Sequence, residues 1–192
     1  YRIVRQLGQG GMGAVFEAID ERLDTTVALK ETFFADERLR KQFEREARLL
    51  ARLQHPALPR VSDHFSEAEG QFLVMQYIAG EDLAELIARR RGAFPEQQVL
   101  SWADQLLDAL DYLHTQDPQI IHRDIKPNNF LIGRDENIDQ LYMMDFGLSK
   151  KYIVNDKHIK FRDKRSLIGT ARYASVNMHM GFEPSRRDDL ES

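Results

Sequence analysis

Hydrophobic and polar residues alternate in the first third of the chain in a way that predicts short strands around one helix. Residues 14–19 alternate with the period of two expected of a strand. Residues 27–30 form a second apolar run, which ends in a lysine. Residues 37–50 instead carry apolar side chains at helical spacing, and Asp36 precedes them as a helix N-cap. We therefore expect strands plus one helix before about residue 76.

The remainder of the chain predicts a larger share of helix. A long helix is expected from Pro95 to His114, because its apolar side chains recur on one face that would pack on a core. That face comprises Val99, Trp102, Ala103, Leu106, Leu110 and Leu113. The apolar run at 141–144 predicts a strand, and the carboxylate of Asp145 comes just after it.

Composition narrows the classes of protein to consider. The chain has no cysteine, which excludes disulfides and thiolate zinc sites. Its net charge of −4 gives no reason to expect a nucleic acid partner. No apolar run is long enough for a membrane span, so we expect a cytoplasmic protein. Composition predicts no particular oligomeric state.

The segment His-Arg-Asp-Ile-Lys-Pro-Asn-Asn at residues 122–129 carries the most informative chemistry. Asp124 can accept the proton of an incoming hydroxyl group, Lys126 can hold a phosphate in transfer, and Asn129 can bind a metal ion. Phosphoryl transfer needs little covalent assistance, so such positioning and charge neutralisation account for most of the catalysis. The spacing therefore predicts a phosphoryl-transfer site.

Three glycines near the N-terminus, Gly8, Gly10 and Gly13, form the pattern G-x-G-x-x-G. The pattern alone is weakly specific, because dinucleotide-binding folds use the same spacing where a helix begins. Here a strand-like stretch follows the last glycine. This order favours a glycine turn between two strands, which would cover phosphates.

Together with Val-Ala-Leu-Lys at 27–30 and Asp-Phe-Gly at 145–147, these motifs resemble the eukaryotic-type protein kinases over essentially the whole chain. The resemblance implies an α+β, two-lobed protein kinase fold with ATP bound in the cleft. The small lobe, residues 1–76, would hold antiparallel strands plus one helix. A hinge would follow at 77–80, and residues 81–192 would form a mainly helical large lobe.

The resemblance also implies roles for individual residues, with ATP and Mg²⁺ as cofactors. The three glycines would cover the phosphates and Lys30 would contact the α- and β-phosphates. Asp124 would be the catalytic base, while Asn129 and Asp145 would hold Mg²⁺. The adenine would lie between Val15 and Ala28 of the small lobe and Leu131 of the large lobe. The hinge backbone at Tyr77 and Ile78 would pair with it, and Met75 would guard the pocket behind.

Lys30 is expected to pair with a glutamate of the helix at 37–50. Glu46 lies in an Arg-Glu-Ala segment that resembles bacterial kinases, and it is the preferred partner; Glu44 is the alternative. The competing interpretation is that this helix has a solvated face with pairs of charges one turn apart.

The resemblance changes near residue 127. Residues 1 to about 125 resemble bacterial serine/threonine kinases, whereas the chain from about residue 128 onward resembles casein kinase 1. All five asparagines lie in the second part, from Asn128 onward. We expect a chimera joined within the catalytic loop. The alternative is compositional drift within one unusual kinase.

Lys126 and Thr170 match the serine/threonine branch, so we expect Ser/Thr hydroxyls of proteins as substrates. Thr170 is expected to hydrogen-bond Asp124 and Lys126. Arg165 and Arg172 occupy two positions that in casein kinase 1 form a site for an acidic or already phosphorylated residue of the substrate. The alternative is that both arginines pair with neighbouring carboxylates of their own segment.

The C-terminus bears on whether the chain is active. By resemblance, Asp189 begins the central helix of the large lobe, so we expect an incomplete large lobe and a C-terminally truncated chain. The competing functional hypothesis is an inactive fragment or pseudokinase that only binds nucleotide or protein. A pseudokinase would be expected to lack Lys30, Asp124, Asn129 or Asp145, and all four are present.

Overall fold

The computed structural model describes residues 1–10, 13–33, 37–67 and 70–192. These residues form two compact units, Tyr1–Ala79 and Gly80–Ser192, called here the first and the second unit. Among the helices that are described, none is both long and apolar enough to cross a lipid bilayer.

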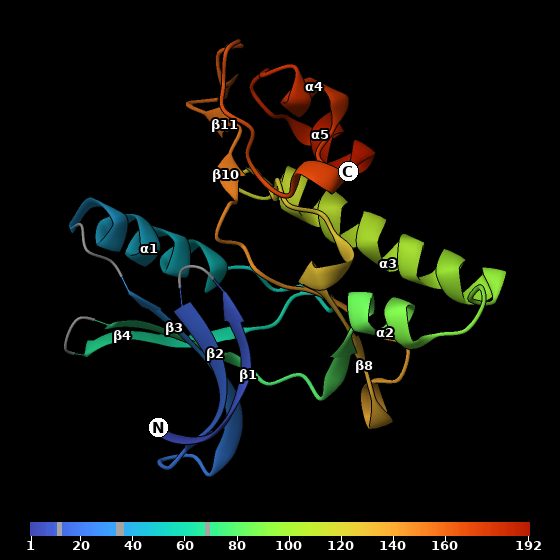
Figure 1. Ribbon diagram of the computed structural model, residues 1–192. Coiled ribbons are helices and arrows are strands. Elements are labelled where there is room, and N and C mark those ends of the chain that lie inside the picture. Colours follow the sequence, from blue (N-terminus) through green and yellow to red (C-terminus); the bar gives the residue numbers. More distant parts are fainter. Residues whose placement is uncertain (11–12, 34–36, 68–69) are drawn as a thin grey trace. The chain divides into compact units, whose positions relative to one another are not determined.

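The first unit is built on a five-stranded antiparallel sheet with the strand order β1-β2-β3-β5-β4 (Figure 1). Its strands are β1 (Arg2–Gly10), β2 (Gly13–Asp20), β3 (Thr25–Phe33), β4 (Val61–Glu67) and β5 (Gly70–Gln76). Among the described residues of this unit there is one helix, α1 (Glu37–Leu50), which contacts β4 and β5. The strands predicted at 14–19 and 27–30 and the helix predicted at 37–50 are confirmed. The expected N-cap, Asp36, lies outside the described residues.

One face of this sheet carries a small apolar core. The register pairs Ala18 with Val27 and Leu29 with Val74, and all four side chains are buried. Four aromatic side chains pack against this core, namely Tyr1, Phe16, Phe65 and Phe72. The ring of Phe65 stacks on Tyr1 at 5.5 Å and on Phe72 at 4.9 Å, so the aromatic rings cover the buried aliphatic groups.

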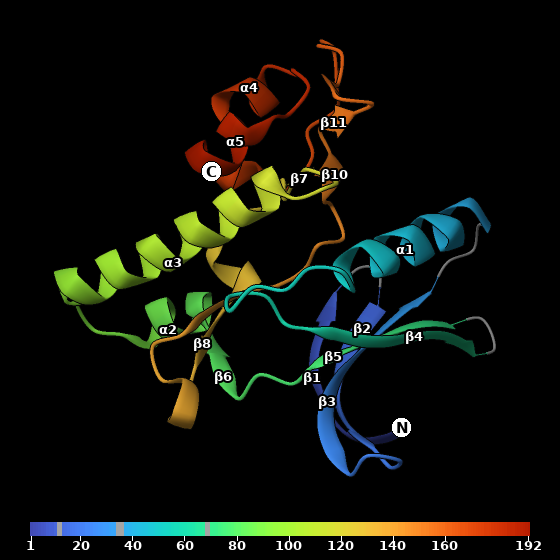
Figure 2. The same cartoon turned by 180° about the vertical axis from the view of Figure 1, so that it is seen from behind.

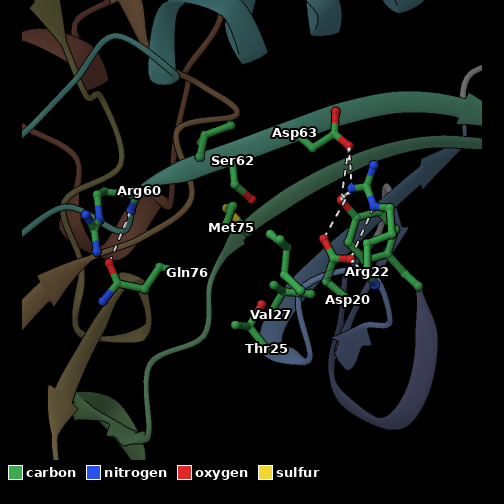
Figure 3. A pocket seen from close by; sticks show the side chains of 12 residues that line it. Asp20, Arg22, Thr25, Val27, Arg60, Ser62, Asp63, Met75 and Gln76 are labelled. Carbon is green, nitrogen blue, oxygen red and sulfur yellow. Dashed lines mark hydrogen bonds and ion pairs between the residues drawn. The ribbon is translucent and has the colours of Figure 1, made fainter.

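A pocket of about 430 Å³ lies beside this core, lined by the ends of β2 and β5 and the starts of β3 and β4 (Figure 3). Arg22 extends over it, and its Nη2 lies 3.2 Å from Asp20 Oδ2 and 3.7 Å from Asp63 Oδ2. The Tyr1 hydroxyl donates to Asp63 at 3.0 Å. Because the Arg22 side chain is 71% exposed, these ion pairs stabilise the fold only weakly.

The second unit combines helices with three small antiparallel sheets (Figure 2). One sheet has the strand order β6-β8-β9 and is formed by β6 (Gly80–Asp82), β8 (Phe130–Gly133) and β9 (Leu141–Met143). In the second sheet β7 (Ile120–Ile121) pairs with β10 (Lys150–Lys151). In the third β11 (Ile153–Val154) pairs with β12 (Lys157–His158). The α-helices are α2 (Leu83–Arg89), α3 (Glu96–Thr115), α4 (Val176–His179) and α5 (Arg186–Glu191). Three short 3-10 turns complete it, η1 (Pro127–Asn129), η2 (Asp135–Asn137) and η3 (Ala171–Tyr173).

The long helix α3 is confirmed, but the predicted buried face is wrong in its first half. Val99 is 46% exposed and Ala103 is also exposed. The buried positions are Trp102, Ala109, Leu110, Leu113 and His114. Within the described residues, α3 packs on the short strands β7 and β9, and these cover only part of its length. Both views place α4 and α5 beside the C-terminal end of α3 (Figure 1; Figure 2).

Two leucines of α3 provide a test of this packing. Leu110→Ala should lower the free energy of unfolding by about 2–5 kcal/mol, because it removes burial and leaves a cavity. Leu107 is 51% exposed, so Leu107→Ala should change it by less than about 0.5 kcal/mol. Urea denaturation can be followed by the fluorescence of Trp102, the only tryptophan. Equal losses in the two variants would contradict the burial described for α3.

Candidate active site

The segment 122–129 begins directly after the buried strand β7 and ends in η1. Arg123 has a φ of 71°, a left-handed conformation that is uncommon for a residue with a side chain. The loop therefore needs fixed partners for its backbone. Asp189 of α5 supplies them: its Oδ2 accepts the His122 N–H at 2.8 Å and its Oδ1 accepts the Arg123 N–H at 2.7 Å.

Asp189 is itself held in place on several sides. Only 2% of it is exposed, and its Oδ2 also lies 2.9 Å from His114 Nε2 of α3. The preceding residue, Asp188, closes a capping box with Ser185 and accepts the Ser175 hydroxyl at 2.6 Å. Because a buried carboxylate must be fully hydrogen-bonded to be tolerated, these contacts fix α5 against the loop.

The Asp124 carboxylate is the centre of the candidate site. Its Oδ1 accepts the backbone N–H and the hydroxyl of Thr170 at 2.9 and 3.0 Å. Its Oδ2 accepts Asn129 Nδ2 at 3.0 Å and lies 2.8 Å from Lys126 Nζ. Lys126 Nζ also donates to Thr170 Oγ1 at 2.8 Å. The predicted contacts of Thr170 with Asp124 and Lys126 are thus confirmed.

Two opposing effects set the pKa of Asp124. Burial works to raise this pKa, but hydrogen bonds from Lys126, Thr170 and Asn129 outweigh it and hold the pKa below its ordinary value. Asp124 is therefore ionised at neutral pH and can accept a proton or a hydrogen bond from a hydroxyl group.

Gly169 allows the segment that carries Thr170 to approach this loop. Its φ is 84°, and a Cβ atom at this position would lie 2.6 Å from the Arg123 carbonyl oxygen. A side chain there would therefore push the segment away from Asp124. Glycine at 169 is a structural requirement for the contacts of Thr170.

The two expected metal ligands come from neighbouring stretches of backbone. Asn129 is buried, and its Nδ2 donates to the carbonyl oxygen of Asp124 at 2.7 Å as well as to its carboxylate. The Asn129 carbonyl accepts the Met144 N–H at 2.8 Å, which brings the chain before Asp145 alongside. The amide oxygen of Asn129 and the exposed Asp145 carboxylate are hard oxygen donors of the kind that suits Mg²⁺.

His122 has a structural role in the loop. The side chain is fully buried, and burial lowers its pKa, so the ring is neutral at pH 7. Its Nε2 lies 3.1 Å from the Met144 carbonyl oxygen and its Nδ1 accepts the Asp124 N–H at 3.3 Å. The ring also makes an edge-to-face contact with Phe146 at 4.9 Å. His122 therefore links the loop to the start of the Asp145 turn.

In the first unit, strand register places several predicted nucleotide-binding residues on one face of the sheet. Val15 pairs with Lys30 and Ala28 pairs with Met75. Residues 28 and 30 of one strand point to the same face, which is opposite to the face of the aromatic core. Tyr77 and Ile78 follow β5, and the Tyr77 hydroxyl accepts a hydrogen bond from Arg5 at 3.3 Å.

Gly8 and Gly10 lie in β1 and Gly13 begins β2, with Gly10 paired to Gly13. A Cβ atom on Gly13 would lie 1.9 Å from the Glu31 carbonyl oxygen, so strand pairing itself requires glycine there. For Gly8, no described atom lies within 4 Å of such a Cβ, so packing of the described residues does not require glycine. Gly8 is therefore a position where the backbone can be approached closely by a ligand.

Other predicted positions are placed only by backbone. Leu131 lies in β8, opposite Tyr142 and Asp82. Glu46 and Glu44 both lie in α1, but the side chain of Glu46 is outside the described residues. The pairing of Lys30 with either glutamate therefore stays a prediction.

Sequence reasoning named Asp189 only as the start of the central helix, whereas α5 begins at Arg186. It missed the burial of the carboxylates that organise the site, Asp188 and Asp189, and also that of Glu183. They are 1%, 2% and 5% exposed. The only signal was their position in or near the run Ser-Arg-Arg-Asp-Asp-Leu-Glu-Ser at 185–192, whose charges are those of an ordinary solvated helix. Burial of the two aspartates follows from contacts with distant residues, which no local pattern encodes.

Thr170 provides a test of the electrostatics at Asp124. Thr170→Val removes the hydroxyl donor, so the pKa of Asp124 should rise toward its ordinary value of 3.8. A lowered folded-state pKa contributes stability that is present above pH 3.8 and lost as pH falls through the folded-state value. In Thr170→Val this contribution should be smaller, and its loss should be complete at a higher pH. Carboxyl NMR titration measures the pKa, with Thr170→Ser as the control that keeps the hydroxyl. An unchanged pKa in Thr170→Val would show that the hydroxyl does not stabilise the carboxylate.

Comparison with known families agrees with this geometry. A family model described as the protein kinase domain matches residues 1–178. The match includes the glycine turn, Lys30, the segment 122–129, Asp145 and Thr170. The chain therefore belongs to the protein kinase domain family, whose members transfer a phosphoryl group to protein and generally use ATP and Mg²⁺.

Proposed function

We propose that this protein is a serine/threonine kinase, which transfers the γ-phosphoryl group of Mg-ATP to Ser and Thr hydroxyls of proteins. The observation that carries the proposal is the network in which Lys126 and Thr170 both contact the Asp124 carboxylate. Lysine two residues after the catalytic aspartate, together with this threonine, is the pattern of the serine/threonine branch noted in the sequence.

Asp124 acts as the base in this proposal. The substrate oxygen forms a bond to the γ-phosphorus, the bond from that phosphorus to the bridging oxygen of ADP breaks, and the hydroxyl proton passes to Asp124. Because the low pKa of Asp124 makes it a weak base, it takes the proton late, when the hydroxyl oxygen is already bonding to phosphorus. Before that step, the carboxylate orients the hydroxyl group.

Lys126, Asn129 and Asp145 balance the charge of the phosphates. Lys126 already shares its ammonium group between Asp124 and Thr170, so it is positioned to contact the γ-phosphate. Asn129 Oδ1 and the Asp145 carboxylate hold Mg²⁺, which neutralises negative charge on the phosphates. The amide nitrogen of Asn129 is occupied by Asp124, which supports the oxygen as the metal-facing atom.

Residues of the first unit bind the nucleotide in this proposal. Lys30 contacts the α- and β-phosphates and pairs with Glu46, or with Glu44 as the alternative. Gly8, Gly10 and Gly13 cover the phosphates. Adenine contacts Val15, Ala28, Met75, Leu131 and the backbone of Tyr77 and Ile78, with residues 77–80 as the hinge that joins small lobe 1–76 to large lobe 81–192.

We also propose a preference for acidic or already phosphorylated substrates, centred on Arg172. Arg165 pairs with Glu183 at 3.4 Å, which agrees with the alternative role of pinning its own segment. Arg172 is exposed and lies over the Tyr173 ring at 5.6 Å, and among described residues it has no ion pair. An exposed guanidinium can bind a phosphate with two parallel hydrogen bonds.

The change of resemblance near residue 127 remains part of the proposal. We propose that residues 1 to about 125 derive from a kinase of the bacterial type and those from about 128 from a casein kinase 1 type. The uneven distribution of asparagine supports it. Single sequencing reads that cross codons 120–135 of the native gene would decide between a joined gene and compositional drift.

The proposed roles of Asp124 and Asp145 can be separated by mutation. Asp124→Asn should reduce kcat by at least about 100-fold, because removing a general base of this kind loses about 10²–10⁴ in rate. It should leave nucleotide affinity largely intact. Asp145→Asn should weaken binding of Mg-ATP as well, because it removes a metal ligand. A radiolabelled phosphotransfer assay and titration with a fluorescent ATP analogue measure the two effects.

Glu136, an exposed acid of η2, provides the matched control, and Glu136→Gln should behave as wild type. Equal phosphotransfer by wild type and Asp124→Asn would refute the kinase assignment of this site. Nucleotide binding without any transfer by wild type would favour the alternative of a pseudokinase that acts as a binding module.

The substrate preference has its own test, on a peptide array with Asp, Glu or phosphoserine placed before the target residue. We expect these peptides to be preferred over neutral ones, and Arg172→Ala to remove most of the preference. The preference should also shrink as salt rises, because part of it is screened electrostatic attraction. A preference for upstream arginine that persists in Arg172→Ala would contradict the proposal.

A further inference from the structure

Glu183 is a buried acid that the proposed chemistry does not use. It precedes α5, its side chain is 4% exposed, and its backbone N–H donates to the Arg162 carbonyl oxygen at 2.9 Å. The Arg165 N–H donates to the Gly181 carbonyl oxygen at 2.8 Å. These two backbone hydrogen bonds hold residues 162–165 beside residues 181–183 and bring the Glu183 carboxylate close to residues 162–165.

Two cationic side chains, Lys150 and Arg165, pair with this carboxylate, and the charges of Arg123 and Arg162 also act on it. The Lys150 ammonium pairs with Oε1, and Arg165 Nε lies 3.4 Å from Oε2. Arg123 is attracted to Glu183 and repelled by Arg165. Burial works to raise the pKa of Glu183, but Lys150 and Arg165 outweigh it and keep the pKa below its ordinary value, so the carboxylate is charged at neutral pH.

Two of these cations are joined directly to the catalytic loop. Lys150 belongs to β10, where it pairs with Ile121 of β7, and β7 leads into the loop at His122. The Arg123 side chain donates from Nε to the Leu148 carbonyl oxygen at 2.6 Å. A displacement of Lys150 or Arg123 would therefore move the backbone that leads into Asp124.

We propose that Glu183 is a positioning residue, the built-in counter-ion that holds the segment 150–183 against the Asp124 loop without a phosphate group on that segment. The proposal rests on the proposed function, since it explains how the base of that reaction is held in place. Cationic side chains gathered in one place repel one another unless an anion lies between them, and Glu183 supplies that anion from within the chain.

The alternative is that Glu183 only fills space. Charge and shape are distinguished by two variants: Glu183→Gln keeps the size and removes the charge, whereas Glu183→Asp keeps the charge and shortens the side chain. A positioning role requires that charge determine the rate, and that an external anion of similar size be able to replace the missing carboxylate. A packing role predicts neither result.

The experiment compares wild type, Glu183→Gln and Glu183→Asp in sodium sulfate and in sodium chloride of equal ionic strength. Glu183→Gln should lower kcat by about 10- to 100-fold with little change in KM for ATP, because a misplaced base reduces turnover rather than nucleotide binding. Glu183→Ala, which also leaves space for an anion, should lose at least as much, and sulfate but not chloride should restore much of its activity. Glu183→Asp should keep most of the activity. Glu191→Gln, a change of an exposed acid in α5, should leave kcat unchanged.

A melting experiment tests the same cluster without relying on phosphotransfer. Sulfate should raise the Tm of Glu183→Ala more than that of wild type, even if the protein transfers no phosphate. If Glu183→Gln does not fold, the exchanged pair Lys150→Glu with Glu183→Lys should melt at a higher temperature than either single variant.

Three results would overturn the proposal. They are a wild-type kcat in Glu183→Gln, a loss that sulfate does not reverse in a folded Glu183→Ala, and an exchanged pair that is no more stable than the single variants. Loss of wild-type activity after phosphatase treatment would overturn the claim that the segment needs no phosphate group to hold its position.

Discussion

The hydrogen bonds that Asp189 accepts from the backbone of His122 and Arg123 are the constraint on which the candidate site depends. Arg123 adopts a left-handed backbone conformation that is unfavourable for a residue with a side chain. The two N–H groups also lie where water has little access, and unpaired they would be costly. The buried Asp189 carboxylate accepts hydrogen bonds from both N–H groups and thereby stabilises the strained conformation of the loop. Asp124 follows Arg123 directly, so this backbone conformation sets the direction of the Asp124 side chain.

The surroundings of Asp124 show how a carboxylate can stay charged in a partly buried site. Burial alone would favour the protonated form, which could not accept a proton from a substrate. Lys126, Asn129 and Thr170 together offset that effect. The same donors leave the carboxylate few free lone pairs, so an incoming hydroxyl group can reach it from few directions. Electrostatic tuning and orientation therefore come from one set of hydrogen bonds.

Local patterns predicted the elements of the fold better than the contacts between them. The strands at 14–19 and 27–30 and the helix at 37–50 have periodicities that depend only on neighbouring residues. Thr170 was placed beside Asp124 by family resemblance, since 46 residues separate the two. The helix face at Val99 and Ala103 was assigned wrongly, because apolar periodicity indicates which residues share a face and not whether another element covers it.

The stretch 183–189 shows why the remaining site residues could not be found from sequence. Its three acids flank a pair of arginines, as on a solvated helix, yet Glu183, Asp188 and Asp189 are all buried while Arg186 and Arg187 are exposed. Each acid is buried because a different partner far along the chain neutralises or hydrogen-bonds it. Since a carboxylate is tolerated in the interior only where such partners meet it, the three acids must be satisfied together as the second unit folds. Formation of the catalytic loop is thereby tied to the completion of this part of the fold.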